Sequence, residues 1–122
     1  MRHSPAFLAL VNDAKSRIKQ LTVEEVAKKI QRGDKFFFID TREDSEWESS
    51  HARGAIHLGK GIIERDIENA IPDTNAEIIL YCGGGFRSAL AADTLQKMGY
   101  RKVISMDGGM RRWRELGLPE EA

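Results

Sequence analysis

The stretch from Tyr81 to Ser88 combines residue types that could perform nucleophilic chemistry. It contains Cys82, which is the one cysteine of the 122-residue chain. Three consecutive glycines follow, and they let the backbone curl and turn N–H groups inward as an anion-binding nest. A helix that begins at Arg87 or Ser88 would add its dipole, and Arg87 would add a full positive charge. These groups should favour the thiolate of Cys82, which is the nucleophilic form of the side chain.

We therefore predict a site in which Cys82 is the catalytic residue. The substrate-binding residues would be the rest of the loop: Gly83, Gly84, Gly85, Phe86, Arg87 and Ser88. A lone cysteine is usually a small buried hydrophobe, and a glycine run is usually a turn. The combination of these residues at this spacing instead favours a cysteine that accepts a group covalently and passes it on.

Phosphate chemistry is a related alternative. Cysteine phosphatases also cradle an anion between a cysteine and an arginine, but their signature has five residues between the two. Only four residues separate Cys82 from Arg87. The shorter loop encloses a smaller space, which suits a single sulfur atom better than a tetrahedral phosphate. In addition, no obvious aspartic general acid is near Cys82 in the sequence. A cysteine phosphatase or arsenate reductase is thus the less favoured interpretation.

The elements that must position the loop alternate between strands and helices. Continuous apolar runs predict strands that are buried on both faces, as in a parallel sheet. The predicted elements are strands at 36–40, 55–58, 78–81 and 103–106 and helices near 62–71, 88–98 and 110–116. A polar loop is expected over 41–54. This pattern predicts an α/β fold with a small, mostly parallel central sheet of about five strands flanked by helices.

Two helices are predicted to open the chain. Ser4 is typical of a helix start, and Thr22 with Glu25 forms a capping box for the second helix. That helix should bury three apolar residues, namely Val26, Ala27 and Ile30. Because the alternation of strands and helices starts after these elements, we expect an N-terminal helical extension over 1–21 and one domain over 22–122.

Composition excludes several classes of protein. The chain has 19 basic and 19 acidic residues, so no net field favours binding to nucleic acid or to a membrane surface. The apolar run at 6–11 is too short for a membrane span and lacks the cleavage site of a signal peptide. One cysteine excludes an internal disulfide and fits a reducing compartment, so we expect a cytoplasmic protein. The histidines lack the partners of a metal site, and no metal is expected.

Three groups of residues resemble signatures of one known family. The run Cys82–Arg87 matches the pattern Cys-x-x-Gly-x-Arg of an active loop. The N-terminal group comprises Asp40-Thr41-Arg42-Glu43, Glu46-Trp47, His51 and Gly54-Ala55, and the C-terminal group comprises Gly99-Tyr100, Val103, Asp107-Gly108-Gly109-Met110 and Trp113. In this order they resemble the rhodanese family, specifically a single-domain rhodanese, over about residues 22–119.

This resemblance implies a sulfurtransferase of the thiosulfate sulfurtransferase type. Cys82 would take sulfane sulfur from thiosulfate or a persulfide and hold it as a persulfide. It would then pass the sulfur to cyanide, a small thiol or a protein thiol, without a metal or organic cofactor. A protein could serve as sulfur donor or acceptor. A second interpretation is a sulfur carrier or docking module that presents the persulfide to a partner without turnover.

The remaining signature residues are predicted to be structural. Asp40, Arg42, Glu46 and His51 would hydrogen-bond neighbouring loops, and Trp47 and Trp113 would pack. Arg111, Arg112 and Arg114 are expected to form a solvated helix face. Steering of an anionic donor at a pocket mouth is the alternative role for these three arginines.

Overall fold

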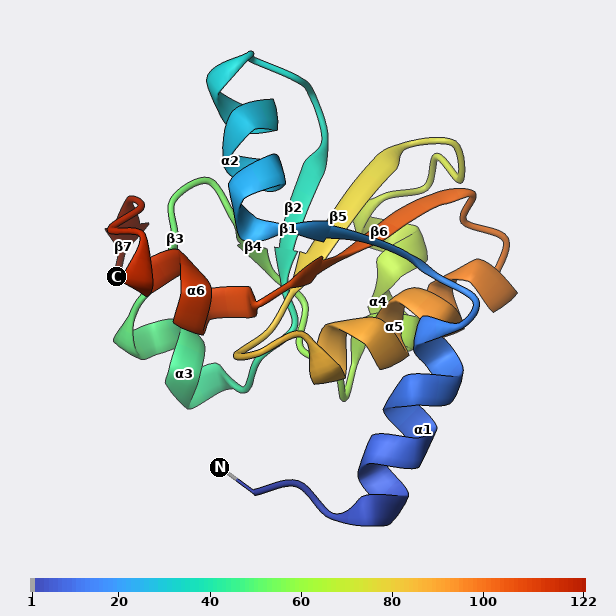
Figure 1. The fold of residues 1–122 in the computed structure, drawn as a ribbon. Helices are drawn as coiled ribbons and strands as arrows, with labels where there is room; N and C mark the ends of the chain where they lie inside the picture. The colour runs from blue at the N-terminus through green and yellow to red at the C-terminus, as the bar shows by residue number, and fades with distance from the viewer. Residues whose placement is uncertain (1) are drawn as a thin grey trace.

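A five-stranded parallel sheet lies at the centre of the computed structural model, which describes residues 2–122 (Figure 1). The strand order is β1-β6-β5-β2-β4, and every neighbouring pair is parallel. The strands are β1 (Lys19–Thr22), β2 (Phe37–Asp40), β4 (Ile56–His57), β5 (Glu77–Tyr81) and β6 (Lys102–Asp107). The predicted α/β fold with about five mostly parallel strands is confirmed.

Helices cover both faces of this sheet. They are α1 (Pro5–Lys15), α2 (Val23–Gln31), α3 (Asp44–Ser49), α4 (Ile63–Ala70), α5 (Phe86–Lys97) and α6 (Gly109–Glu115). Figure 1 shows α4 and α5 on one face with α1 beyond α5, and α2 and α6 on the other face. Within the described part of the chain, no helix is long and apolar enough to cross a membrane.

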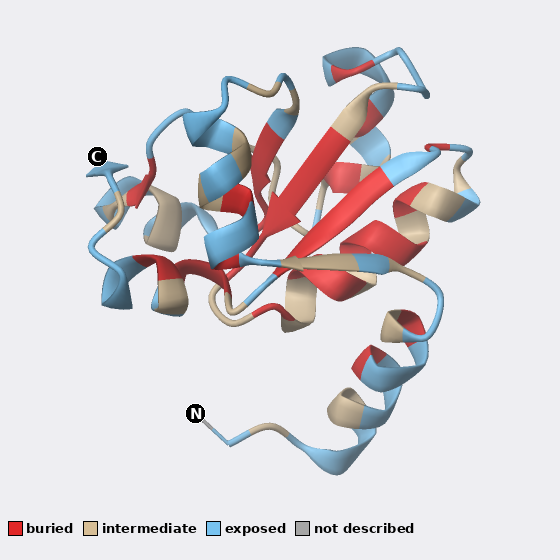
Figure 2. Cartoon of the chain, turned by 45° about the horizontal axis from the view of Figure 1, so that its top comes forward, coloured by how far each residue is buried: buried red, intermediate tan, exposed pale blue. Residues whose placement is uncertain are grey.

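The central strand β5 explains why an apolar run is needed in this fold. Ile78 and Leu80 join one hydrophobic cluster with α4 and α5 residues, whereas Ile79 and Tyr81 join the opposite cluster with α2 and α6 residues. All four side chains are fully buried (Figure 2). Because side chains alternate between the two faces of a strand, burial of both faces requires consecutive apolar residues.

Both predicted helix starts are confirmed. The Ser4 hydroxyl accepts a hydrogen bond from the N–H of Phe7 at 3.3 Å. Thr22 accepts from the N–H of Glu25 at 3.1 Å, and the Glu25 carboxylate accepts from the N–H of Thr22 at 2.8 Å. The predicted burial is confirmed for Val26 but wrong for Ile30, which is 42% exposed, and Ala27 is only partly buried. The buried stripe of α2 is formed by Val23 and Val26 in its first turns.

Four short elements were not predicted from the sequence. β1 forms by pairing Lys19 through Thr22 with Ile104 through Asp107 of β6, and not by continuing a helix. The expected polar loop over 41–54 contains α3 and strand β3 (His51–Ala52), which pairs antiparallel with β7 (Glu120–Glu121). These segments are short and lack an apolar run, so their strands depend on pairing with distant residues.

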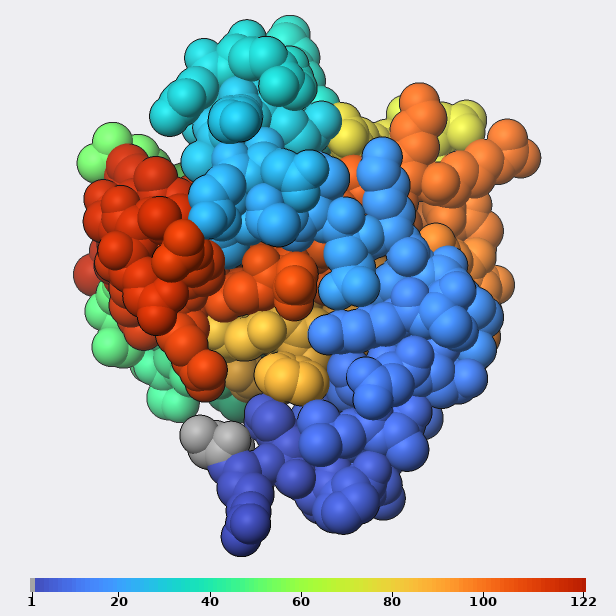
Figure 3. Space-filling view, in the orientation of Figure 1, coloured from blue at the N-terminus to red at the C-terminus, as the bar shows by residue number. Residues whose placement is uncertain are grey.

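Helix α1 is fixed to α5 by packing and by an ion pair. Val11 and Ala14 are buried, and the Arg17 guanidinium donates two hydrogen bonds to the Asp93 carboxylate at 3.0 and 2.8 Å. Arg17 holds the pKa of Asp93 below its usual value. This anchor places the N-terminal segment beside the start of α5, as the dark blue and gold surfaces in Figure 3 show.

The turn between β6 and α6 packs tightly against the residues that follow β5. The N–H of Met110 donates to the Cys82 carbonyl at 2.8 Å, and the N–H of Arg111 donates to the Gly83 carbonyl at 3.0 Å. Gly109 has φ +54°, and a Cβ atom there would lie 2.5 Å from the Cys82 carbonyl oxygen. Only glycine permits this close approach of the two backbones.

We predict that Gly109→Ala lowers the free energy of unfolding by about 3 kcal/mol, because it adds a backbone clash to positive-φ strain. Gly117→Ala is the matched control, since Gly117 has φ +66° and no atom within 4 Å of a built Cβ. The control should lose only about 1 kcal/mol. Urea denaturation of both variants measures the difference, and equal losses would contradict the predicted clash.

Candidate active site

Cys82 lies at the carboxyl end of β5, where parallel sheets bind ligands. Its side chain is only 1% exposed. Gly85 has φ +100° and forms the N-cap of α5, so the helix begins at Phe86 and not at the predicted Arg87 or Ser88. Because Gly85 adopts the left-handed conformation, the helix begins one or two residues earlier than predicted. The N–H groups at the start of the helix therefore point at the sulfur.

Two N–H donors and one hydroxyl group of the loop surround the sulfur atom. The N–H groups of Gly85 and Ser88 point at Cys82 Sγ, with nitrogen–sulfur distances of 3.1 and 3.4 Å. The Ser88 hydroxyl oxygen lies 3.5 Å from the same atom. N–H groups at a helix start stabilise negative charge, so this environment suits an anionic sulfur.

A second hydroxyl lies behind Ser88. Ser105 of β6 is hydrogen-bonded to Ser88, with 2.8 Å between the two hydroxyl oxygens. Both serines are completely buried. The contact to Cys82 therefore continues through Ser88 into the sheet. Sequence reasoning missed Ser105, because no local pattern links it to the cysteine loop.

Arg87 forms an ion pair with Glu46 of α3 beside the loop. The two nitrogen–oxygen distances are 2.8 and 3.2 Å. Glu46 holds the pKa of Arg87 above its usual value, and Arg87 holds the pKa of Glu46 below its own. The guanidinium also lies against Gly83, where a Cβ would be 3.2 Å from Nη2. The pair thus fixes Arg87 at the rim, and its charge is partly offset.

The residues after β2 brace the same edge of the sheet. The buried Arg42 guanidinium donates to the Asp40 carboxylate at 2.8 Å and to the Ser50 carbonyl at 2.7 Å. Thr41 donates from its hydroxyl to the Tyr81 carbonyl at 2.9 Å, directly before Cys82. Arg42 therefore makes the expected hydrogen bond to a neighbouring loop.

The two tryptophans pack as expected. The Trp47 ring stacks on the His51 ring, with 3.4 Å between their centroids and 3° between their planes. Trp113 of α6 is buried in the hydrophobic cluster on the α2 and α6 face of the sheet. Its indole N–H donates to the Pro119 carbonyl at 2.9 Å.

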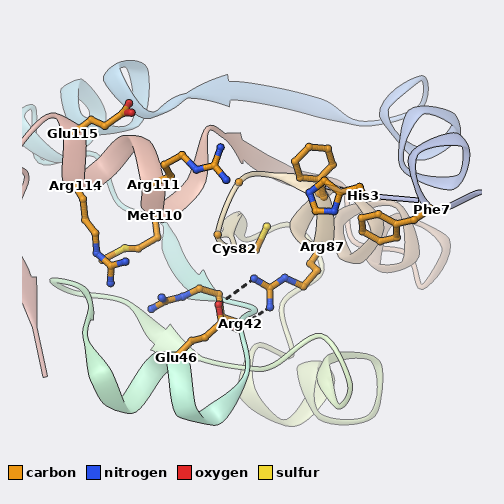
Figure 4. Close-up of a pocket in the computed structure, with 13 residues that line it drawn as sticks. His3, Phe7, Arg42, Glu46, Cys82, Arg87, Met110, Arg111, Arg114 and Glu115 are labelled. Atoms are coloured by element: carbon orange, nitrogen blue, oxygen red, sulfur yellow. Dashed lines mark hydrogen bonds and ion pairs between the residues drawn. The ribbon is translucent and has the colours of Figure 1, made fainter. Parts of the chain in front are cut away.

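A pocket of about 960 Å³ opens above the sulfur (Figure 4). Four segments line it: His3 and Phe7; Arg42 and Glu46; Cys82, Gly83, Gly84, Phe86 and Arg87; and Met110, Arg111, Arg114 and Glu115. The structure thus brings five of the seven predicted site residues to the pocket wall. Gly85 and Ser88 contribute instead through their hydrogen bonds to the sulfur.

Two of the three arginines of α6 line the pocket, and the third forms an ion pair with α2. Arg111 and Arg114 line the pocket, which the sequence offered only as the alternative to a solvated face. Arg112 is directed elsewhere and pairs with Glu24 of α2 at 2.7 Å. Sequence reasoning missed the pocket role of His3 and Phe7, because nothing in the local sequence links them to a loop some 75 residues away.

Comparison with known proteins agrees with this geometry. A family model described as Rhodanese-like domain matches residues 22–116. The chain is 34% identical over 98 residues to YrkF of Bacillus subtilis, a candidate sulfur carrier protein. This match covers 80% of the chain but only 52% of YrkF, so the chain spans about half of that protein. It is 31% identical over 84 residues to the thiosulfate sulfurtransferase GlpE of Vibrio cholerae, covering 69% of the chain and 77% of GlpE.

A solved structure resembles the whole chain. It is a Rhodopseudomonas palustris protein of unknown function, described as a possible tyrosine phosphatase, with 29% identity and a TM-score of 0.88. The similarity covers 99% of both chains. With the family match spanning most of the chain and the cysteine loop in its expected place, this chain belongs to the family of proteins built on a Rhodanese-like domain.

Proposed function

We propose that the chain is a sulfurtransferase that moves sulfane sulfur through a persulfide on Cys82. The observation that carries this proposal is the sulfur itself, which is recessed in a pocket and receives N–H groups from Gly85 and Ser88. We also propose that residues 1–21, which carry α1 and most of the edge strand β1, extend the matched domain on its N-terminal side, since the family match begins at residue 22. A cytoplasmic location stays a prediction.

In the first half-reaction, the Cys82 thiolate attacks the outer sulfur of thiosulfate. A bond forms between Sγ and that sulfur while the sulfur–sulfur bond of thiosulfate breaks. Sulfite leaves with the electron pair, and Cys82 is left as a persulfide anion. The total charge is the same on both sides, and no oxidant or reductant is consumed.

In the second half-reaction, cyanide or a thiolate attacks the outer sulfur of the persulfide. The bond between the two sulfurs breaks, and its electron pair returns to Sγ as a thiolate. The N–H groups of Gly83 and Gly84 have no acceptor among residues 2–122, so both are available to the outer sulfur. Such a ring of N–H groups stabilises the persulfide anion without a cofactor.

The serine pair supports the thiolate. With Cys82 as a thiolate, Ser105 donates to Ser88 and Ser88 donates to Sγ, so both hydroxyl protons have acceptors. With Cys82 as a thiol, the same order of donors can hold, and the weak S–H donor is the group left without an acceptor. The two serines therefore supply a hydroxyl donor to an anionic sulfur, beside the N–H groups of Gly85 and Ser88.

Two other functions have specific support. Similarity to YrkF favours a sulfur carrier that presents its persulfide to a partner protein, which the same loop would serve. The description of the Rhodopseudomonas palustris protein favours a phosphatase. Against a phosphatase stand the four-residue spacing and the Arg87–Glu46 pair, which holds the arginine at the rim and offsets its charge.

The proposed function predicts steady-state transfer of sulfur from thiosulfate to cyanide. Cys82→Ser should lower kcat/KM by at least about 1,000-fold, because the hydroxyl is a poor nucleophile and no other thiol exists. Formation of thiocyanate measures the transfer. Hydrolysis of an aryl phosphate is assayed in parallel and should be absent.

The outcomes separate the three functions. A persulfide that forms without turnover would identify the carrier. Aryl phosphate hydrolysis that is lost in Cys82→Ser would identify a phosphatase. Undiminished thiocyanate formation by Cys82→Ser would rule out the proposed nucleophile.

The serine pair predicts a graded effect on the loading of sulfur. Ser88→Ala should lower the rate constant for loading of Cys82 by thiosulfate by about tenfold, because the anionic sulfur loses a hydroxyl donor. Ser105→Ala should lower this rate constant less, since Ser88 keeps its contact with the sulfur but loses the group that polarises it. The exposed Ser49→Ala is the control and should leave the rate constant unchanged. A larger loss for Ser105→Ala than for Ser88→Ala would contradict the proposed order of donors.

A further inference from the structure

The ion pair between Arg87 and Glu46 occupies the groups with which the cysteine loop would bind an oxyanion. Arg87 is the only charged side chain between Cys82 and Ser88. Its two terminal nitrogens donate to the two oxygens of the Glu46 carboxylate, at 2.8 and 3.2 Å (Figure 4). Oxyanions such as phosphate bind arginine through the same two parallel hydrogen bonds. The carboxylate of Glu46 therefore holds the place that an oxyanion would take on Arg87.

Glu46 is held in this position by the start of α3. Its Oε1 atom accepts a hydrogen bond from the N–H of Glu43 at 3.0 Å, as part of a capping box. The guanidinium of Arg87 and this N–H together hold the pKa of Glu46 below its usual value. Only 32% of the Arg87 side chain and 36% of the Glu46 side chain are exposed, so water and salt screen the two charges only in part. A ligand that binds Arg87 must therefore displace a carboxylate that stays charged and stays in place.

Four more side chains of the pocket wall are charged at neutral pH, and three of them have partners in the described chain. They are Arg42 (paired with Asp40), Arg114 (with Glu120), Glu115 (with Arg112) and Arg111, for which the described residues offer no ion pair. Arg111 can therefore attract an anion to the pocket, but the one cation of the loop itself is already paired. The charge balance beside the sulfur is thus set by Glu46.

The donors that the loop offers to a bound group are backbone N–H groups. Those of Gly85 and Ser88 point at the sulfur, at 3.1 and 3.4 Å. Those of Gly83 and Gly84 have no acceptor in the described part of the chain. Such N–H groups carry partial charges, which stabilise one negative charge on a sulfur atom. A tetrahedral dianion such as phosphate gains much more from a full positive charge, which Glu46 offsets here.

We infer that Glu46 is a specificity-determining residue, which keeps the loop of Cys82 from binding tetrahedral dianions and leaves it able to hold a single anionic sulfur. Glu46 acts through Arg87, by occupying the two nitrogens that would otherwise bind the dianion. This role goes beyond the hydrogen bond to a neighbouring loop that the sequence predicts for Glu46. The inference rests on the proposed function and adds the residue that decides which anions the site accepts. Thiosulfate is affected at its sulfonate end, since its outer sulfur is the atom that Cys82 attacks.

The test measures binding of inorganic phosphate to the full chain before any sulfur is loaded. Phosphate bound at the loop should protect Cys82 from alkylation by iodoacetamide. The phosphate concentration that halves the alkylation rate therefore measures the affinity. The pH is fixed, and sodium chloride keeps the ionic strength constant, because salt screens the charges that are compared.

Two single variants remove one carboxylate charge each from α3. Glu46→Gln keeps an acceptor for the N–H of Glu43, because glutamine also serves at this position of a capping box. Glu48→Gln is the matched control, since Glu48 is exposed on the same helix and lies outside the pocket. The double variant Glu46→Gln/Arg87→Gln removes both partners of the ion pair.

Glu46→Gln should lower the half-protecting phosphate concentration by at least about tenfold, because the guanidinium of Arg87 can then pair with phosphate. Glu48→Gln should leave this concentration at the wild-type value. The gain should disappear in the double variant. With thiosulfate as donor, Glu46→Gln should lower the concentration for half-maximal loading of Cys82 and should leave the maximal loading rate within about twofold of the wild type.

Four results would overturn the inference. The first is a half-protecting concentration that is unchanged in Glu46→Gln. The second is an equal gain in Glu48→Gln, which would reflect net charge alone. The third is a gain that survives in the double variant, which would show that phosphate binds away from Arg87. The fourth is protection of the wild type at phosphate concentrations below about 1 mM, whatever the variants do.

The phosphate measurements do not depend on sulfur transfer. A wild type that loads no sulfur from thiosulfate would refute the proposed function. The half-protecting phosphate concentrations would still decide whether Glu46 excludes dianions from the loop. Failure of the inference and failure of the proposed function are therefore separate results.

Discussion

The contact between the sulfur of Cys82 and the N–H groups at the start of α5 is the constraint on which the rest of the structure depends. It requires a strand that ends at Cys82, a left-handed glycine at Gly85 and a helix that begins one residue later. A flat loop would leave the sulfur without donors. In the low-dielectric interior those donors favour an anionic sulfur, which is what a reversible sulfur carrier needs.

The surrounding elements hold this contact from three sides. At the β6–α6 turn, backbone N–H groups donate hydrogen bonds to the carbonyls of Cys82 and Gly83. These hydrogen bonds depend on the close approach that Gly109 permits. The Arg87–Glu46 pair ties the loop to α3. Ser105 supports Ser88 from β6 below. The loop is therefore positioned by its neighbours as well as by its own glycines.

Local sequence predicted the parts of the fold and site that depend on local physics. Apolar runs identified β2 and β5, capping residues identified the starts of α1 and α2, and the glycine run identified the loop of Cys82. Strand β1 was missed because its four residues form a strand only by pairing with β6. His3 and Ser105 were missed for the same reason, since their neighbours are distant in the sequence.

Intact mass spectrometry of the protein before and after exposure to thiosulfate tests the central claim most directly. Because Cys82 is the only thiol, the account predicts that the wild type gains the mass of one sulfur atom and that a reductant removes it. A wild-type protein that gains no sulfur while its thiol still reacts with iodoacetamide would contradict the account. So would an equal gain in Cys82→Ser.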